Sequence, residues 1–132
     1  MPKVRFRCHC TICQNVYKAA YADVLVFRRG QVQLADKSKI KWIHTKRPSP
    51  LVRGLCKACD GPVLGHFYGA LSFVPARTVS GLELPSVDRD IYYRTRTENL
   101  NDDVPKCEGV LASYAGLTMP FLAVLMSPGH PI

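Results

Sequence analysis

The stretch RCHCTICQNV, residues 7–16, places three cysteines, Cys8, Cys10 and Cys13, within six positions. Side chains alternate along an extended segment, so Cys8 and Cys10 are predicted to face the same side, with His9 turned away. Cys13 can join them if the chain bends after Thr11. Three thiols this close together are typical of a metal site, and they raise the question of whether a fourth ligand completes it.

A second cysteine group lies in GLCKACDGPVLG, residues 54–65, where Cys56 and Cys59 have C-x-x-C spacing and Asp60-Gly61 follows. This is the pattern of the tight knuckle in which two thiolates chelate zinc. Soft thiolate ligands favour zinc, which does no unwanted redox chemistry. The alternative is that all five cysteines are buried free thiols, since cysteine is among the most buried residue types. Two groups in turn-rich segments favour zinc, at one or two ions per chain.

The remaining candidate ligands have less support from their spacing. Cys107 stands alone in VPKCEGV, and we interpret it as a packing residue. His66 lies seven residues beyond Cys59 and can supply a missing ligand; otherwise it is an ordinary strand residue.

Length and composition indicate one globular domain over residues 1–132. The chain has 132 residues, of which 47% are hydrophobic, which argues against a second core and against wholesale disorder. MPKVRFRCHC at the start is charged and lacks the apolar run of a signal peptide, so we expect a cytoplasmic protein. Residues 109–126 are uncharged, but Gly116 and Pro120 interrupt them. We expect a buried terminal segment or an oligomer contact there, not a membrane span.

Charge is unevenly distributed along the chain. Residues 1–57 hold 13 Lys and Arg against two acidic residues, and residues 58–132 hold 5 against 8, for net charges of +11 and −3. Such a basic half can attract nucleic acid or a small anion, or it can be a solvated face. Aromatic residues interleave poorly with the basic ones, which disfavours nucleic acid as a partner.

Short β-like runs predict a mostly β fold of antiparallel strands with long connections and little helix. Ten prolines and nine glycines leave few windows of helix length. The strands are expected at 22–27, 31–34, 39–45, 63–69 and 90–97, with turns at 28–30, 46–50, 60–61 and 101–105. Short helices are expected at 15–22 and near 107–115.

CHCTIC at 8–13, CKAC at 56–59 and IYYRTRTENLNDDVPKCEG at 91–109 resemble the glutathione-dependent formaldehyde-activating enzymes, a family that includes the centromere protein V type domain. The resemblance covers about residues 4–110, and it leaves 111–132 as a divergent apolar tail. It implies the Mss4-like fold of coiled antiparallel β-sheets. It also implies a carbon–sulfur lyase that joins glutathione and formaldehyde into S-hydroxymethylglutathione.

By this resemblance, Cys8, Cys10 and Cys13 would hold a catalytic zinc with one open coordination position, and Cys56 and Cys59 would be half of a structural zinc site. A zinc-bound thiol is deprotonated near neutral pH, as attack on an aldehyde requires. Glutathione carries two carboxylates, so the basic half would favour its capture. The candidate anchors are Arg28, Arg29, Lys39 and Lys41.

The sequence departs from the family pattern in three places. No C-x-C pair precedes Cys8 to complete the structural site, Lys18-Ala19 stands where a Gly-Ser step is usual, and Cys107 replaces an aromatic residue. The structural site is then lost, or water and His66 complete it, or Cys56 and Cys59 share the first three thiols in one closed four-cysteine site. In that last case the domain would be a non-catalytic zinc-binding module that contacts other proteins. A nucleic-acid-binding zinc domain is the third alternative.

Overall fold

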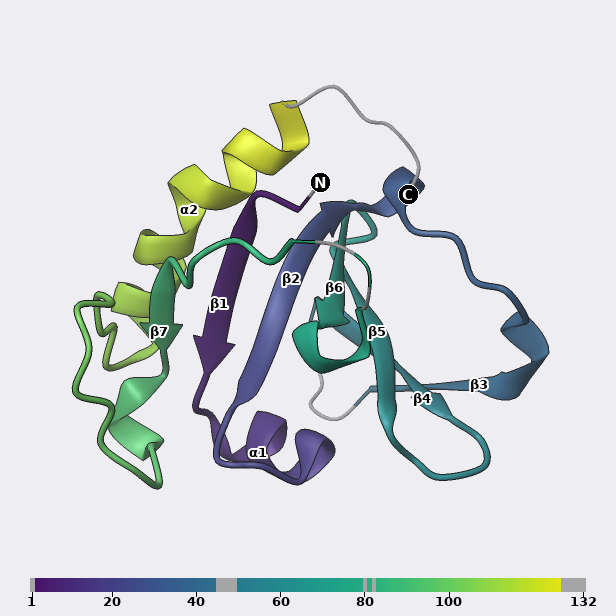
Figure 1. Cartoon of the computed structure of the whole chain (residues 1–132), viewed down its shortest axis with the longest axis horizontal. Coiled ribbons are helices and arrows are strands. Elements are labelled where there is room, and N and C mark those ends of the chain that lie inside the picture. The colour runs from purple at the N-terminus through teal and green to yellow at the C-terminus, as the bar shows by residue number, and fades with distance from the viewer. Residues whose placement is uncertain (1, 45–49, 80, 82, 127–132) are drawn as a thin grey trace.

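In the computed structural model of the chain, β1 is the second-last strand of a seven-stranded sheet and leads directly into the first cysteine group (Figure 1). The structure describes residues 2–44, 50–79, 81 and 83–126. The strands are β1 Val4–Cys8, β2 Ala22–Arg28, β3 Ile40–Ile43, β4 Leu51–Cys56, β5 Pro62–Phe67, β6 Leu71–Pro75 and β7 Arg89–Ile91. Their order in the sheet is β3-β4-β5-β6-β2-β1-β7, antiparallel throughout except for the parallel pair β1 and β7.

Alternation along the central strands separates two apolar clusters on opposite faces of the sheet. On β1, Val4, Phe6 and Cys8 are buried while the residues between them are partly exposed. These three side chains belong to the larger cluster, which contains Val24 and Val26 of β2. Leu25 and Phe27 of β2 point the other way, into a smaller cluster with Ala76. The larger cluster is therefore the core that lies next to the cysteines.

Two α-helices lie in the described residues, α1 at Thr11–Tyr17 and α2 at Val110–Met126. Helix α1 sits at the end of β1 and β2, and α2 packs against β1, β2 and β7 (Figure 1). Leu117 and Val124 of α2 are buried in the larger cluster, while Leu111, Met119 and Met126 are exposed. Within the described part of the chain, neither helix combines the length and the apolar character that a membrane span requires.

Helix α2 continues through both residues that were expected to interrupt it. Gly116 allows the helix to approach the sheet closely, since a Cβ atom there would lie 2.9 Å from the Cys107 sulfur and 3.0 Å from Arg89 Cδ. Cys107 is itself buried in the larger cluster, which confirms its interpretation as a packing residue. The helix expected near 107–115 therefore begins at Val110 and extends to Met126.

The mostly β fold class is confirmed, and so are the strands expected near 22–27, 39–45 and 63–69. The prediction of strand at 31–34 is wrong, because the Arg28 N–H donates to the Gln31 side chain and the chain turns over Arg29–Gln31 instead. The strand expected at 90–97 ends at Ile91, because Tyr92 has a left-handed backbone with φ 53°. The strands β1, β4 and β6 were not predicted.

Three further expectations concern local structure. The first helix was expected at 15–22, but Cys10 caps it at Thr11–Tyr17, and the left-handed Lys18 ends it. The turn at 60–61 is confirmed, with Asp60 at φ 60°. Most of the turn expected at 46–50 lies outside the described residues.

Candidate metal centre and its cavity

The first cysteine group converges where β1 gives way to α1. Cys8 is the last residue of β1, Cys10 is the N-cap of α1, and Cys13 lies in the first helical turn. The Cys8 Sγ lies 3.4 Å from the Cys10 Sγ, and the backbone N–H of Cys13 donates to the Cys10 Sγ at 3.3 Å. The Cys10 sulfur thus caps helix α1 as a serine hydroxyl would, and this hydrogen bond brings Cys13 next to Cys8 and Cys10.

The predicted arrangement of these residues is confirmed, apart from the position of the bend. Cys8 and Cys10 face the same side, and His9 is turned away and fully buried, with its ring between Tyr21 and Tyr93. The bend occurs at Cys10, because helix α1 already begins at Thr11. This is one residue earlier than expected.

Hydrogen bonds among the sulfurs make the three thiols unequal. The thiols of Cys13 and Cys8 donate to the Cys10 sulfur and lower the pKa of Cys10. Hydrogen bonds of the Cys8 thiol with Cys10 and with Cys13 raise the pKa of Cys8, and burial raises it further. Arg53 of β4 contributes an Nη2–H that lies 3.5 Å from the Cys13 Sγ. The group can therefore hold a negative charge, as a metal-binding group of thiols must.

The donor set fits a zinc ion. The three sulfurs all lie within 4.8 Å of one another, and a tetrahedral ion with Zn–S bonds of about 2.3 Å needs them about 3.8 Å apart. Among the described residues, no fourth His, Cys, Asp or Glu atom comes within that same distance of all three. Three thiolates without a fourth protein ligand are the arrangement that leaves a coordination position for substrate.

Cys56 and Cys59 do not join this group in the described structure. They form a separate knuckle after β4, where the Asp60 N–H donates to the Cys56 carbonyl at 2.8 Å and the Cys56 N–H donates to the Gly61 carbonyl at 2.8 Å. Backbone N–H groups of Cys59 and Ala58 lower the pKa of Cys56. This backbone suits a thiolate pair, and a second zinc at these residues stays a prediction.

His66 lies on β5, where its ring stacks on Trp42 with centroids 5.2 Å apart. Its Nδ1 lies 2.9 Å from the Ser72 Oγ, within the β5–β6 pair. Burial lowers the pKa of His66. Whether it completes a metal site stays a prediction.

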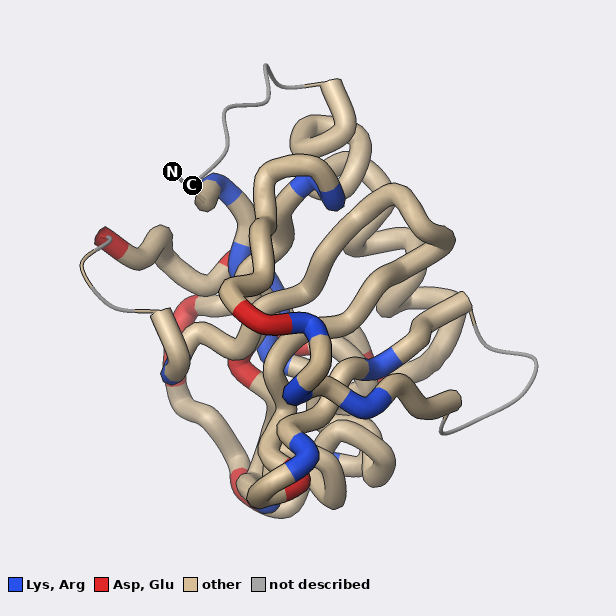
Figure 2. Tube along the Cα trace, turned by 90° about the vertical axis from the view of Figure 1, so that its right-hand side faces the viewer, with Lys and Arg blue, Asp and Glu red and all other residues tan. Residues whose placement is uncertain are grey.

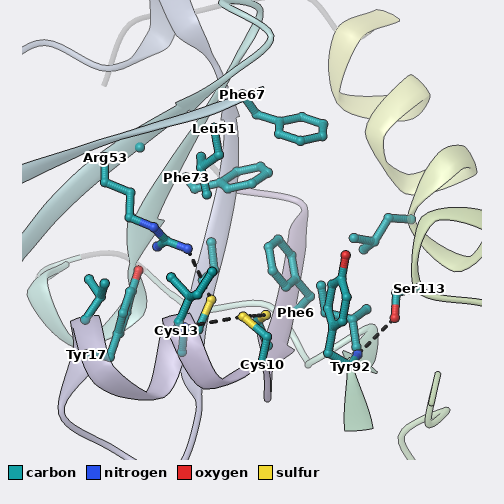
Figure 3. Close-up of a pocket in the computed structure, with 18 of the residues that line it drawn as sticks. Phe6, Cys10, Cys13, Tyr17, Leu51, Arg53, Phe67, Phe73, Tyr92 and Ser113 are labelled. Atoms are coloured by element: carbon teal, nitrogen blue, oxygen red, sulfur yellow. Dashed lines mark hydrogen bonds between the residues drawn. The ribbon is translucent and has the colours of Figure 1, made fainter. Parts of the chain in front are cut away.

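A cavity of about 330 Å³ opens beside the three thiols. Its walls come from β1, β2, β4, β5, β6, β7, α1 and α2, and the thiols of Cys10 and Cys13 face it (Figure 3). The lining is mainly aliphatic and aromatic: Phe6, Leu51, Leu55, Leu64, Phe67, Phe73, Tyr92, Leu117 and Phe121 are among its residues. An open metal position at the thiols would therefore face an apolar chamber.

Polar groups in this lining are few. Arg53 reaches in from β4 towards Cys13, and the Tyr92 ring stands between the thiols and α2 (Figure 3). Burial raises the pKa of Tyr92 to about 12, so its hydroxyl keeps its proton at neutral pH. The Ser113 hydroxyl accepts a hydrogen bond from the Tyr92 backbone N–H at 2.9 Å, which holds this left-handed residue against α2.

The four basic residues proposed as substrate anchors, Arg28, Arg29, Lys39 and Lys41, do not line the cavity. Lys41 pairs with Asp60, and other basic side chains of the first half also have acidic partners, such as Arg5 with Asp23. Blue and red segments accordingly both occur over the molecule (Figure 2).

Arg53, which does line the cavity, was not among the residues predicted from the sequence. The sequence could have indicated it, because Leu51, Arg53 and Leu55 are alternate residues of one strand and all three line the cavity.

A buried carboxylate fixes the backbone on the far side of the cysteines. Asp90 of β7 is fully buried and accepts hydrogen bonds from Arg7 at 2.7 and 2.8 Å. Its Oδ1 also lies 2.7 Å from His9 Nε2, and Lys106 Nζ lies 2.9 Å from its Oδ2. The His9 N–H donates to the Ile91 carbonyl at 2.9 Å. Strand β7 thus holds both the ring and the backbone of the residue between Cys8 and Cys10.

Comparison with known proteins agrees with the resemblance noted in the sequence. A family model described as glutathione-dependent formaldehyde-activating enzyme matches residues 1–95. The match includes both cysteine groups and ends before most of the 91–109 block. No curated protein matches the chain.

Proposed function

The chain belongs to the glutathione-dependent formaldehyde-activating enzyme family, and from this premise we propose that it joins a thiol to formaldehyde at a zinc ion held by Cys8, Cys10 and Cys13. The observation that carries the proposal is the convergence of three thiols, without a fourth protein ligand in the described residues, on the wall of a cavity. A closed structural zinc site has no open coordination position to face a cavity. A cavity that only binds a ligand does not require three metal-binding thiols in its wall.

The reaction is the addition of a thiolate to an aldehyde. When bound, zinc supplies a deprotonated substrate thiol at neutral pH and a Lewis acid for the aldehyde oxygen. The substrate sulfur forms a bond to the formaldehyde carbon, the carbonyl π bond opens, and the oxygen takes up a proton. The Tyr92 hydroxyl faces the same cavity and keeps its proton, so it is our candidate donor to that oxygen. Arg53 stabilises negative charge at Cys13.

Glutathione is the thiol that the family name supplies, which would make the protein a cytoplasmic carbon–sulfur lyase with S-hydroxymethylglutathione as product. We assign to Cys8, Cys10 and Cys13 the catalytic zinc and to Cys56 and Cys59 a second, structural ion. The proposal predicts one zinc ion per chain at the first group alone, and two when Cys56 and Cys59 are also occupied.

The test is product formation by zinc-loaded protein mixed with glutathione and ¹³C-formaldehyde. Exchange NMR measures how fast the adduct forms relative to the spontaneous reaction. Wild type should accelerate it, Cys10→Ser should not, and Cys107→Ser should behave as wild type because its thiol lies outside the metal group. Zinc-loaded wild type without acceleration for any thiol would contradict the proposal and favour a non-catalytic zinc-binding module.

A further inference from the structure

The cavity beside the thiols has a chemical character that glutathione does not match. Among the described residues that line it, Arg53 is the only one that carries a charged side chain apart from the thiols themselves. No Asp, Glu, Lys or His of the described residues contributes to its wall. A ligand that enters therefore finds one cation, a few hydroxyl-bearing residues (Tyr17, Tyr92, Ser113 and Tyr114) and otherwise aliphatic and aromatic surface.

The apolar part of the wall is an ordered aromatic cluster. The ring of Phe73 packs edge-on against Phe6, with centroids 5.3 Å apart, and stacks on Phe67, also at 5.3 Å. Phe121 of α2 closes the group, with its centroid 5.6 Å from that of Phe73 and 5.7 Å from that of Phe67. Aromatic rings in such a cluster favour a further ring or a branched hydrocarbon placed edge-on or offset.

Arg53 marks where a negative charge would be held. Its Nη2 lies 3.5 Å from the Cys13 Sγ, so its guanidinium sits next to the thiol group and not at the cavity's far end. Figure 3 shows this side chain reaching from β4 towards the sulfurs, with the phenylalanine rings beyond. The planar fork of a guanidinium suits a carboxylate. A carboxylate at this position would be close to any sulfur bound at the thiols.

Glutathione brings two carboxylates, an ammonium group and two amides. A mainly apolar chamber with a single cation and a few hydroxyls can satisfy one of the carboxylates, and most of the remaining polar groups that enter it lose water without gaining a partner. A thiol with one carboxylate near its sulfur and a hydrocarbon body would place each part against matching surface. Apolar ligand area buried in the chamber then contributes to binding.

We propose that this cavity selects a thiol with an aromatic or branched apolar body and a single carboxylate close to the sulfur, in preference to glutathione. That the ligand is a thiol rests on the proposed function. That it has an apolar body and a single carboxylate rests on the lining of the cavity alone. The reaction is unchanged: the substrate sulfur adds to the aldehyde carbon, the former carbonyl oxygen receives a proton from Tyr92, and the proton that the thiol gave up restores the Tyr92 hydroxyl.

Binding is tested by calorimetric titration of the zinc-loaded protein with three probes that lack a free thiol. These are 3-phenylpropanoate, its neutral amide 3-phenylpropanamide, and S-methylglutathione. We expect 3-phenylpropanoate to bind about tenfold or more tightly than its amide, since a charge-assisted hydrogen bond is lost. We also expect it to bind more tightly than S-methylglutathione. Equal or tighter binding of S-methylglutathione would overturn the proposal without any variant being made.

Arg53→Gln tests the position of the charge. This variant should bind 3-phenylpropanoate and 3-phenylpropanamide with equal affinity, whereas Arg53→Lys should retain part of the difference in affinity. The matched control is Arg29→Gln, an exposed arginine outside the cavity, which should leave the difference unchanged. Persistence of the full difference in Arg53→Gln, with thermal unfolding as in wild type, would overturn the proposal.

Failure of the proposed function gives a different result. If 2-mercapto-3-phenylpropanoate and glutathione both fail to add to formaldehyde faster than in buffer, the reaction is wrong. Tight, Arg53-dependent binding of 3-phenylpropanoate would still stand in that case. Conversely, a protein that accelerates the glutathione reaction and binds S-methylglutathione more tightly than 3-phenylpropanoate keeps the reaction and loses the proposed selectivity.

Discussion

The Nε2 of His9 lies 2.7 Å from the Oδ1 of Asp90, and both side chains are fully buried. His9 stands between two predicted metal ligands, while Asp90 comes from a strand 81 residues further along the chain. The orientation of the Cys8–Cys10 segment therefore depends on a parallel strand pair and a buried carboxylate. This relationship makes the thiol group sensitive to changes on the opposite side of β1.

Asp90→Asn should destabilise the protein by roughly 3 kcal/mol, because Arg7 and Lys106 would lose the carboxylate that neutralises them. The free energy of unfolding in urea, measured on metal-free reduced protein, checks this. Asp102→Asn is the matched control: this more exposed residue pairs with the same two cations, and it should cost less than about 1 kcal/mol. Equal losses in the two variants would contradict the account.

The contribution of Asp90 should also depend on pH. Burial opposes its ionisation, but hydrogen bonds from Arg7, His9 and Lys106 outweigh burial and lower the pKa of the carboxyl. A lowered pKa gives stability that is fully present above the unfolded value of about 3.9 and is lost as pH falls through the folded value. The stability gap between wild type and Asp90→Asn should therefore be full at pH 7 and shrink below about pH 4. Urea titrations of the metal-free pair over this range measure it, and a constant gap would be the contrary result.

Gly116 and Cys107 should be energetically coupled. A Cβ at residue 116 would lie 2.9 Å from the Cys107 sulfur, so Gly116→Ala should cost about 1 kcal/mol despite the gain in helix propensity. In a Cys107→Ala background the same change should cost less or stabilise. A double-mutant cycle on unfolding free energies gives the coupling. Additive effects would show that α2 does not pack against Cys107 as described.

Tyr92→Phe tests the candidate proton donor. It removes one hydroxyl from the cavity wall and leaves the thiols in place, so zinc content should match wild type. Adduct formation should slow by about a hundredfold, the usual cost of removing one donor to a developing oxyanion. Elemental analysis and the NMR rate assay measure the two quantities on the same sample. An unchanged rate would remove Tyr92 from the mechanism.

Local patterns were predictable, and long-range pairing was not. Cys8, Cys10 and Cys13 lie within one strand end and one helical turn, so their spacing alone predicted that they meet. The strands near 22–27 and 63–69 were recognisable from apolar runs between turns. The first helix was misplaced, because a sulfur cap at Cys10 is not among the usual start signals.

The cavity was not predictable, since it depends on which strands neighbour each other. Arg53 reaches Cys13 only because the fold brings β4 next to helix α1, in a contact between residues 40 positions apart in sequence. Strand β7 ends because Tyr92 has a left-handed backbone. The alternating side chains of residues 90–97 fit a longer strand, so the sequence pattern did not indicate this end. The basic residues proposed as anchors were selected by their charge alone, and the charge of a side chain does not indicate whether it points into the cavity.

The most direct test of the account is zinc per chain by elemental analysis of wild type, Cys10→Ser and the double variant Cys56→Ser, Cys59→Ser. We predict that Cys10→Ser loses one zinc relative to wild type, and that the double variant keeps the zinc at the first thiol group. Unchanged zinc in Cys10→Ser would contradict a metal centre at Cys8, Cys10 and Cys13. Complete loss in the double variant would contradict an open site, because the two cysteine groups would then share one closed ion.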